Sequence, residues 1–383
     1  MITAPSTAEV SRYGRGPAVH ARRKGRFNDC DEARCLEQGL RDMAGIDVPT
    51  PIISPEGKIL ALAWGERPDR RSPQVNYIDE PRLVRELLLT PTTYDLLVAA
   101  ATSGKQWPGK WVKTATTNPV AGQYMDLWPV AGDPTVGAYG GAAYTAVQKS
   151  ETTTGALVHG GNVSTETKHL VNAVCAYSAG ATAPTLYIYD RVLTYEACSF
   201  NASVNQAFTN GVAPARYVGA SEGGLKVMWT CQTVYGATAS NLTQFQYTDQ
   251  DGNATQSMPT TPTALIIVSA AAPTSTLGAR VTCPAVGTTP FGPYLFMAAG
   301  DSGVRQATNF TTSAANTGTT CVVLSRQLAI LPMQLAGRGE LFDLTAGLQA
   351  LPRIRDGACL ALFAKFAAAT GCNFEVDVTP VWG

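Results

Sequence analysis

From about residue 105 to residue 383 the sequence is a succession of short alternating runs, rich in Val, Thr, Tyr and Phe and separated by turn residues. Such runs are typical of β-strands. The expected strands are 110–115, 123–130, 142–148, 169–178, 185–195, 225–235, 242–248, 254–259, 264–270, 294–299, 304–310, 320–327, 358–366 and 374–382. In "YTDQDGNAT", Asp251-Gly252 lies between two alternating runs and predicts a hairpin. Frequent strands without helix-length insertions predict a mainly β fold, an antiparallel β-sandwich or jelly roll, rather than βαβ units.

The first 104 residues have a different pattern. Helical signals cover 28–44, 80–89 and 90–104, with Gly104 as the last stop signal. Residues 48–57 are predicted to be a proline-rich link, and 58–64 a short apolar strand. The predicted organisation is a basic extended arm (1–27), short helices and linkers (28–104) and a β-sandwich region (105–383). A division of that region into two sub-domains near 201–220 is an alternative.

Charge is scarce and balanced along most of the chain. Only 15% of the residues are charged and the formal net charge is zero, whereas a typical soluble domain has about a quarter of its residues charged. The surface is therefore expected to be mostly neutral, as suits a protein covered by partners, and no global charge directs the chain to nucleic acid or membranes. No run is long and apolar enough for a membrane helix, and "MITAPSTAEV" lacks the pattern of a secretory signal. Synthesis in a cytoplasm is expected.

The arm, residues 1–27, is the exception to this balance. It concentrates cations without an acid among them, and we predict that they bind a partner: Arg12, Arg15, Arg22, Arg23, Lys24 and Arg26. Such clusters contact an acidic protein surface or DNA. A solvated, flexible tail is the alternative.

Nine cysteines are spread singly through the chain and form no C-x-x-C pair. They are interpreted as reduced, buried small hydrophobes rather than metal ligands. Cys359 follows the charged corner "LPRIRD" but begins a strand that is apolar on both faces, so a core role is favoured over a nucleophile. His159 and His169 are too isolated to predict a metal site. No cofactor is expected.

Catalytic motifs are weak. "GASEG" around Ser221 matches G-x-S-x-G, but a strand follows where a hydrolase has a helix. "GKQWPGK" imitates a P-loop, but Trp111 follows it and no helix is expected there. Acid pairs for glycoside hydrolysis need no local motif, and the available carboxylates are Asp126, Asp133, Asp190, Glu196, Asp249, Asp251, Asp301, Glu375 and Asp377. Asp249 and Asp251 are assigned to a turn, and Glu375 and Asp377 to a solvent or interface face. The sequence therefore predicts no catalytic residue and no enzyme.

The order of segments in the C-terminal part is distinctive. "TPFGPYLFMAAGDSGVRQATNFT" is followed by "TTCVVLSRQLAILPM", "LPRIRDGACLALFAKFAAATG" and "DVTPVWG", and preceded by "LYIYDRVLTYEACSFNASVNQ" and "APARYVGASEGGLKVMWTC". Over roughly residues 170–383 this order resembles a family of tailed-bacteriophage virion structural proteins. The resemblance rests on the residue composition of these segments and their order more than on a tight motif, and residues 1–100 fall outside it.

The resemblance implies a non-enzymatic virion protein, made in the bacterial host, that binds the major capsid lattice as a decoration, cement or minor head protein. It also implies a homo-oligomer whose partners are the major capsid protein or other virion proteins. A neck, tail or head-fibre component is one alternative. A virion-associated glycan-binding module or glycan hydrolase is another, which exposed aromatics at Trp107, Trp111 and Trp128 would favour; core positions are the expectation for these three.

Overall fold

The structure is a computed structural model of the chain that divides into two compact units, Met1–Leu88 and Leu89–Gly383. It describes residues 50–53, 59–63, 99–114, 122–178, 183–200, 204–218, 223–238, 240–259, 265–268, 278, 280–281, 285–286, 289–290, 292–345, 351–368 and 371–383. The arm with its six cations and the helices predicted at 28–44 and 80–89 lie outside these residues. The domain boundaries at 27 and 104 and the break near 201–220 stay predictions.

In the first unit the described residues form one hairpin. Strand β1 (Thr50–Ile53) pairs antiparallel with β2 (Ile59–Ala63). The strand predicted at 58–64 is thus confirmed, whereas the prediction of a link across 48–57 is wrong at β1. Ile52 and Ile53 favour an extended pairing there, and Pro51 is compatible with an edge position.

A short helical turn opens the described part of the second unit. Residues 99–102 are helical, and Ser103 N donates to Ala99 O over 3.0 Å. Gly104 has a φ of +77°, a left-handed conformation that suits glycine and ends the helix. The predicted end of the third helix is therefore confirmed.

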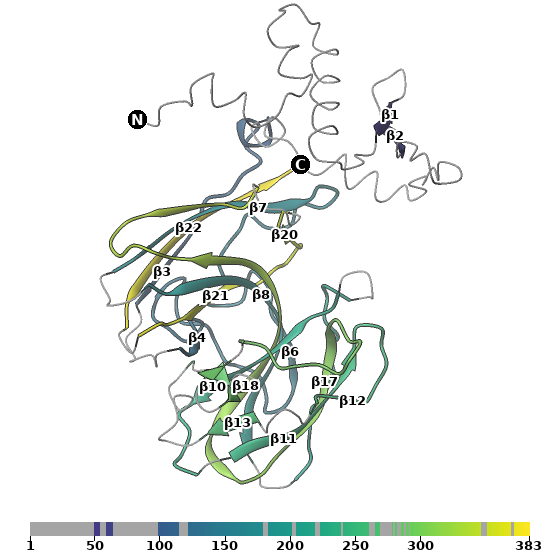
Figure 1. Cartoon of the computed structure of the whole chain (residues 1–383), viewed down its shortest axis with the longest axis vertical. Helices are drawn as coiled ribbons and strands as arrows, with labels where there is room; N and C mark the ends of the chain where they lie inside the picture. The colour runs from purple at the N-terminus through teal and green to yellow at the C-terminus, as the bar shows by residue number, and fades with distance from the viewer. Residues whose placement is uncertain are drawn as a thin grey trace, which may run out of the picture. The chain divides into compact units, whose positions relative to one another are not determined.

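A seven-stranded central sheet organises the second unit (Figure 1). Its order is β14-β10-β18-β8-β21-β4, and β6 pairs with β8 off this path. The bounds are β4 (Tyr124–Asp126), β6 (Ala146–Gln148), β8 (Thr185–Phe200), β10 (Lys226–Thr233), β14 (Arg280–Val281), β18 (Asn316–Pro332) and β21 (Leu360–Lys365). Strands β8 and β18, of 16 and 17 residues, run the length of the sheet and pair with each other.

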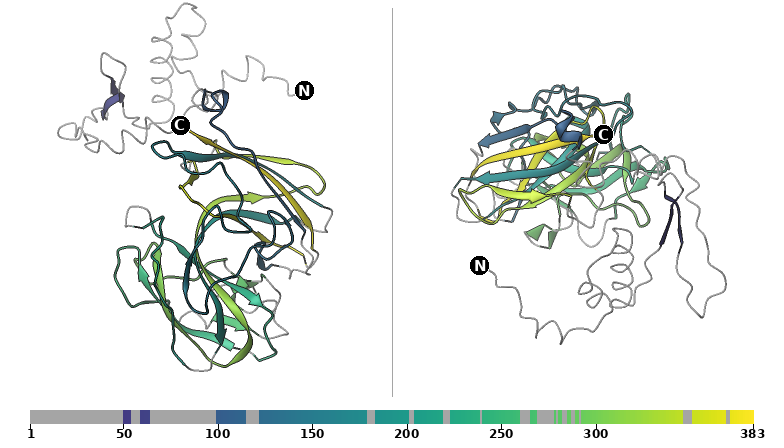
Figure 2. Two further views of the ribbon diagram at one scale, coloured as in Figure 1. Left: turned by 180° about the vertical axis from the view of Figure 1, so that it is seen from behind. Right: turned by 90° about the horizontal axis from the view of Figure 1, so that it is seen from above.

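Two further antiparallel sheets pack at the two ends of the central sheet (Figures 1 and 2). The first has the order β19-β7-β22-β3-β5, with β20 on β7, and we call it the outer sheet. Its strands are β3 (Gly109–Thr114), β5 (Gly132–Asp133), β7 (Lys168–Tyr177), β19 (Glu340–Asp343), β20 (Arg353–Ile354) and β22 (Asn373–Trp382). The second has the order β12-β11-β17-β9, with β13 on β11. Its strands are β9 (Gln206–Ala207), β11 (Ser240–Asp249), β12 (Gln256–Ser257), β13 (Leu265–Val268) and β17 (Val304–Thr312). A separate hairpin joins β15 (Ala285–Val286) to β16 (Thr289–Pro290).

One bulge lets strand β8 contribute to both cores. Leu186 and Ile188 belong to the core under the outer sheet, whereas Leu193 and Tyr195 belong to the core under β11 and β17. Val192 has no partner on β18, so the parity of the alternation changes at that point. A third buried cluster, around Tyr189 and Phe363, lies on the alternate positions. The predicted fold class, a mainly β antiparallel sandwich, is therefore confirmed.

One expected strand is wrong. Residues 294–299, "YLFMAA", are irregular. Pro293 directly before them cannot donate to a ladder. The side chain of Leu295 is instead buried beside the central sheet, and its backbone N–H donates to Val227 O over 2.9 Å.

Candidate functional site

One concave feature of the described residues is a cavity of about 270 Å³. Charged side chains from three distant parts of the sequence line it: Glu166, Lys168, Arg216, Arg353, Arg355 and Asp356. Four of the six are cations, whereas the whole chain has as many acids as bases. We call this feature the cationic cavity.

The corner "LPRIRD" places the two arginines. Strand β20 pairs with the start of β7, so that Ile354 lies opposite Lys168. Because side chains alternate along an extended segment, burial of Ile354 in the core turns Arg353 and Arg355 the other way. Both arginines are half-buried and line the cavity.

A buried ion pair forms one wall. Arg216 Nε and Nη2 donate to the two carboxylate oxygens of Asp190 over 2.9 and 2.7 Å. Cys359 N donates to the same carboxylate over 2.8 Å. This bidentate geometry fixes the guanidinium group and neutralises its charge locally. Arg216 is therefore a structural part of the wall.

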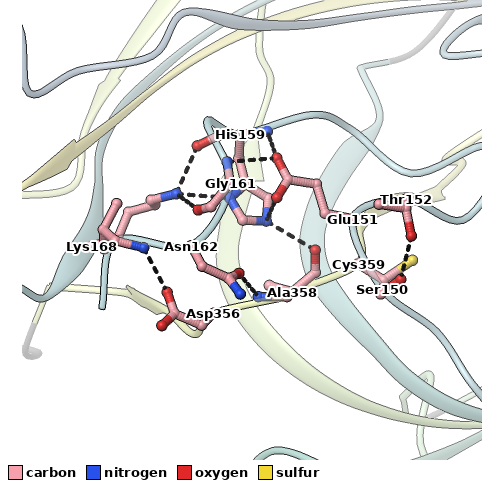
Figure 3. Close-up of polar contacts among 12 residues, drawn as sticks. Ser150, Glu151, Thr152, His159, Gly161, Asn162, Lys168, Asp356, Ala358 and Cys359 are labelled. Carbon is pink, nitrogen blue, oxygen red and sulfur yellow. Dashed lines mark hydrogen bonds and ion pairs between the residues drawn. The ribbon is translucent and has the colours of Figure 1, made fainter. Parts of the chain in front are cut away.

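Lys168 connects the cavity to a buried histidine (Figure 3). Its Nζ donates to His159 Nδ1 over 3.1 Å and to His159 O over 2.9 Å. His159 Nε2 donates to Ala358 O over 2.9 Å, so Nδ1 is the acceptor of a neutral ring. Burial, reinforced by the Lys168 charge, lowers the pKa of His159. Burial also lowers the pKa of Lys168, whose Nζ lies 5.2 Å from the centre of the Trp382 ring.

Glu151 holds the loop that carries His159. Its Oε1 accepts the backbone N–H groups of His159 and Gly161 over 2.6 and 3.0 Å. Across the rim, Val163 N donates to Asp356 Oδ1 over 3.0 Å, and Gly357 N donates to Asn162 Oδ1 over 2.8 Å. The last two bonds tie Asn162 and Val163 to the turn after β20, which makes a preformed rim.

The predicted core cysteines are confirmed where they are described. Six are free and buried: Cys175, Cys198, Cys231, Cys321, Cys359 and Cys372. Burial raises the pKa of the Cys359 thiol to about 12, so that it is protonated at neutral pH. The charged corner before it lines the cationic cavity instead of activating the thiol. Cys30, Cys35 and Cys283 lie outside the described residues.

The weak motifs have structural explanations where they are described. "GKQWPGK" runs into strand β3, without the helix that a P-loop requires. Asp249 accepts N–H groups from Asp251 and Asn253 at the predicted hairpin. Ser221 lies outside the described residues.

The carboxylates divide into buried and exposed groups. On the central sheet, Arg191 Nη1 donates to Asp126 and Lys149 Nζ contacts Glu196, each over 2.7 Å, and all four side chains are buried. On the outer sheet, Glu375 and Asp377 lie on the outward face of β22 as predicted, and Glu375 pairs with Lys110.

The three tryptophans do not form an exposed cluster. Trp111 and Trp128 are buried, as expected, whereas Trp107 is 42% exposed, and the core prediction is wrong for this residue. It precedes Pro108, and its N–H donates to Pro380 O at the end of β22. The ring packs beside Gly160, where its Cβ and Cγ would lie 3.1 and 3.3 Å from an added Cβ.

The cationic cavity was not predicted from the sequence. The sequence predicts that His159 and His169 are isolated structural residues, and in the described structure each ring contacts a backbone carbonyl. The alternation Arg353-Ile354-Arg355 was the one available signal, because a strand turns such a pair to one side. Its partners from residues 166–168 and 216 have no local relation to it.

Comparisons with known proteins give no match: no family model, no curated protein and no solved structure is similar to the chain. Within the described ranges, no group of three or more His, Cys, Asp or Glu side chains is placed to hold a metal ion. None of the helices found there has the length and hydrophobicity to span a membrane.

Proposed function

We propose that the chain is a non-enzymatic structural protein of a tailed-bacteriophage virion that binds the major capsid lattice as a decoration, cement or minor head protein. The sequence resemblance over residues 170–383 supports this proposal. The physical support is a protein with few charges, built as two sandwiches on one shared sheet. Such a body offers broad, neutral faces for repeated packing in a homo-oligomer or a lattice.

The outward face of the outer sheet is the observation that carries the proposal. Leu341 on β19 lies directly opposite Val174 on β7, and these side chains are 68% and 38% exposed. Val112 on β3 is 40% exposed, and β22 with Glu375 and Asp377 lies between it and the Leu341–Val174 pair. Scattered exposed apolar side chains are ordinary, but neighbours along one sheet face favour contact with another protein. We assign this face to packing against the shell, and the cations of the arm to a second contact on an acidic protein surface or DNA.

The test is the copy number of the chain in purified particles, by quantitative mass spectrometry against the major capsid protein. A lattice-binding protein is expected at on the order of hundreds of copies, as closed shell symmetry requires. A count of about six or twelve would move it to the neck, tail or a fibre, where rings have such symmetry. Complete absence from particles would overturn the proposal.

A paired substitution tests the assigned face. Leu341→Asp is expected to reduce incorporation into particles, because it places a charge in the proposed contact. Val234→Asp is the matched control, since Val234 is 63% exposed and follows β10, away from the strands of the outer sheet. Equal incorporation of both variants would contradict the assignment of the face.

A further inference from the structure

We infer that the contact between His159 and Lys168 is an acid-sensitive latch: protonation of the histidine ring releases the lysine and frees the loop of residues 158–163. This loop carries one side of the rim of the cationic cavity, so the latch controls how firmly the rim is held. The inference goes beyond the proposed structural role, and neither depends on the other. It rests on the contacts of the two side chains and on the way in which the loop is anchored.

The ring of His159 is fully buried and uses both of its nitrogens (Figure 3). Its Nε2 donates to Ala358 O over 2.9 Å, and its Nδ1 accepts a proton from Lys168 Nζ over 3.1 Å. A neutral ring with its proton on Nε2 satisfies both contacts. A second proton would occupy Nδ1, so that the lysine loses its acceptor and two cations lie side by side.

Lys168 is held at the ring by further bonds. Its Nζ also donates to His159 O over 2.9 Å and to Gly161 O, so a separation of the two cations breaks the bonds to these carbonyl groups of the loop. The backbone of Lys168 is fixed in the outer sheet, where it pairs with Ile354 on β20 and with Trp382 on β22. The loop is therefore the part that moves.

The loop itself is irregular and is anchored by side chains. The N–H groups of His159 and Gly161 donate to the Glu151 carboxylate, and the N–H of Val163 donates to Asp356. Local opening of such a segment requires less free energy than unfolding of the sheets behind it. Loss of the lysine bonds therefore opens the loop before the fold is lost.

The charged groups around the ring set the direction of the pH effect. Lys168 opposes a positive ring, whereas Asp190 and Glu151, whose Oε2 lies 3.6 Å from Nε2, favour it. Asp356 acts on the lysine instead, and the protonated Cys359 thiol adds no charge. Burial, reinforced by the lysine charge, lowers the pKa of the ring from 6.5. The latch is therefore closed above pH 6.5, and its hold declines as the pH falls from 6.5 towards the lowered pKa.

The test is hydrogen exchange of the full-length chain over about pH 5–8, measured by mass spectrometry as protection factors for peptides that cover residues 158–163. Opening that takes up one proton becomes up to about tenfold more frequent for each pH unit below 6.5. We expect protection of the loop to fall in this way, while peptides from β22 (Asn373–Trp382) stay protected. Protection of the loop that does not depend on pH overturns the inference. A parallel loss in both regions, which indicates global unfolding, overturns it as well.

Variants connect the exchange to the ring. His159→Gln offers an uncharged acceptor to Lys168 and a donor to Ala358 O at every pH, so the acid-dependent loss of protection should disappear. His169→Gln is the matched control, because His169 is also buried but its ring contacts Leu351 O outside the loop. Its loop should respond to acid like that of the unaltered chain. An unchanged acid response in folded His159→Gln contradicts the latch.

Thermal unfolding of each variant shows whether it is folded. If His159→Gln does not fold, Lys168→Met decides the question by NMR titration of the histidine ring signals. Removal of the lysine charge should raise the pKa of His159, because one cause of its lowering is gone. A His159 titration that does not move contradicts the latch. Neither result alters the copy number in particles, so failure here and failure of the structural proposal are distinguishable.

Discussion

The two sandwich halves of the second unit share strands β8 and β18 but are filled with different side chains. The core under the outer sheet is mainly aliphatic, with Leu170, Leu186, Ile188, Leu360 and Leu362 among its members. We call it the aliphatic half. The core under β11 and β17 is built largely from interlocked rings: Tyr195, Phe200, Phe208, Trp229, Phe245, Tyr247 and Phe310. We call it the aromatic half.

The strand ladders of the two halves differ in the same way. In the aliphatic half, β22 pairs with β3 and β21 with β8 without a register shift, and the β22–β7 ladder shifts register at one place, between Thr379 and Pro380. In the aromatic half, the β11–β17 ladder shifts register at three places. There the ring hydroxyls bond to the backbone: Ala307 N donates to Tyr195 over 3.1 Å, and Ala298 N donates to Tyr247 over 2.7 Å. Where a strand ladder is regular, the backbone hydrogen bonds align the strands and aliphatic side chains can fill the core. Where the register shifts, some backbone amides lose their partner on the next strand, and a side chain with a polar end can accept their N–H groups.

The largest expected effect is the loss of a ring from the aromatic half. Trp229 is fully buried, with its ring centre 5.0 Å from that of Phe310. Trp229→Ala should lower the free energy of unfolding by about 5 kcal/mol and Leu362→Ala by about 3 kcal/mol, because the ring leaves the larger cavity. Denaturant unfolding measures both.

The same experiment tests whether the halves are coupled. Because β8 and β18 run through both, each variant should shift one common transition. Two separate transitions, with each variant moving only one, would show that the halves unfold independently and would contradict this interpretation of the shared strands.

The next effect concerns Asp190, which lies on β8 next to the bulge between the halves. Asp190→Asn removes the charge that holds Arg216 but keeps an acceptor for Cys359 N. We expect a loss of about 3–4 kcal/mol, since an unpaired buried charge is left behind. Asp377→Asn, on the outward face of β22, is the control and should change the free energy of unfolding by less than about 1 kcal/mol. A similarly small change for Asp190→Asn would mean that Arg216 finds another partner.

A pH effect is expected in the aliphatic half. Burial lowers the pKa of His169 from 6.5 to about 4. The unfolded chain therefore binds more protons between these values, and the free energy of unfolding falls as the pH drops from about 6.5 to 4. The contribution is about 3 kcal/mol, at 1.36 kcal/mol for each unit. His169→Gln should flatten this part of the curve relative to the unaltered chain, and parallel curves would contradict the assignment.

The sequence predicts the positions of the strands well, but it predicts poorly how the strands bend and pack, for a physical reason. The alternation of apolar and polar side chains is a local signal, so the strand predicted at 374–382 matches β22 (Asn373–Trp382) to within one residue. The bulge at Val192 has no such signal, because "IYDRVLTY" is buried on both faces and a change of parity leaves the pattern intact. The apolar run at 294–299 has the composition of a strand but forms an irregular segment that buries Leu295 beside the central sheet. Apolar composition alone does not distinguish a buried strand from a buried irregular segment.

The cationic cavity cannot be predicted from the sequence, for a different reason: its lining residues come from distant segments. It joins residues near 166, 216 and 354 through the β7–β20 pairing and the Arg216–Asp190 bond. Neither contact follows from the composition or spacing of its own segment. The buried pairs Arg191–Asp126 and Lys149–Glu196 are similar, because a charge in a strand pattern gives no indication of the distant residue that compensates it.

The smallest effect tests the hydroxyl contacts in the aromatic half directly. Tyr195 OH donates to Asn210 Oδ1 over 2.6 Å and accepts the Ala307 N–H. Ala307 lies opposite Tyr247 where the β11–β17 register shifts between Gln246 and Tyr247. Tyr195→Phe keeps the ring but leaves a buried amide without its acceptor, so we expect a loss of about 1–2 kcal/mol. Amide exchange at Ala307 should rise as well, because its protecting bond is gone. Tyr177→Phe in the aliphatic half is the matched control and should change both quantities little, because register rather than a ring hydroxyl aligns the strands there. Equal losses for the two variants would mean that ring hydroxyls stabilise both halves alike, and the proposed difference between the ladders would not hold.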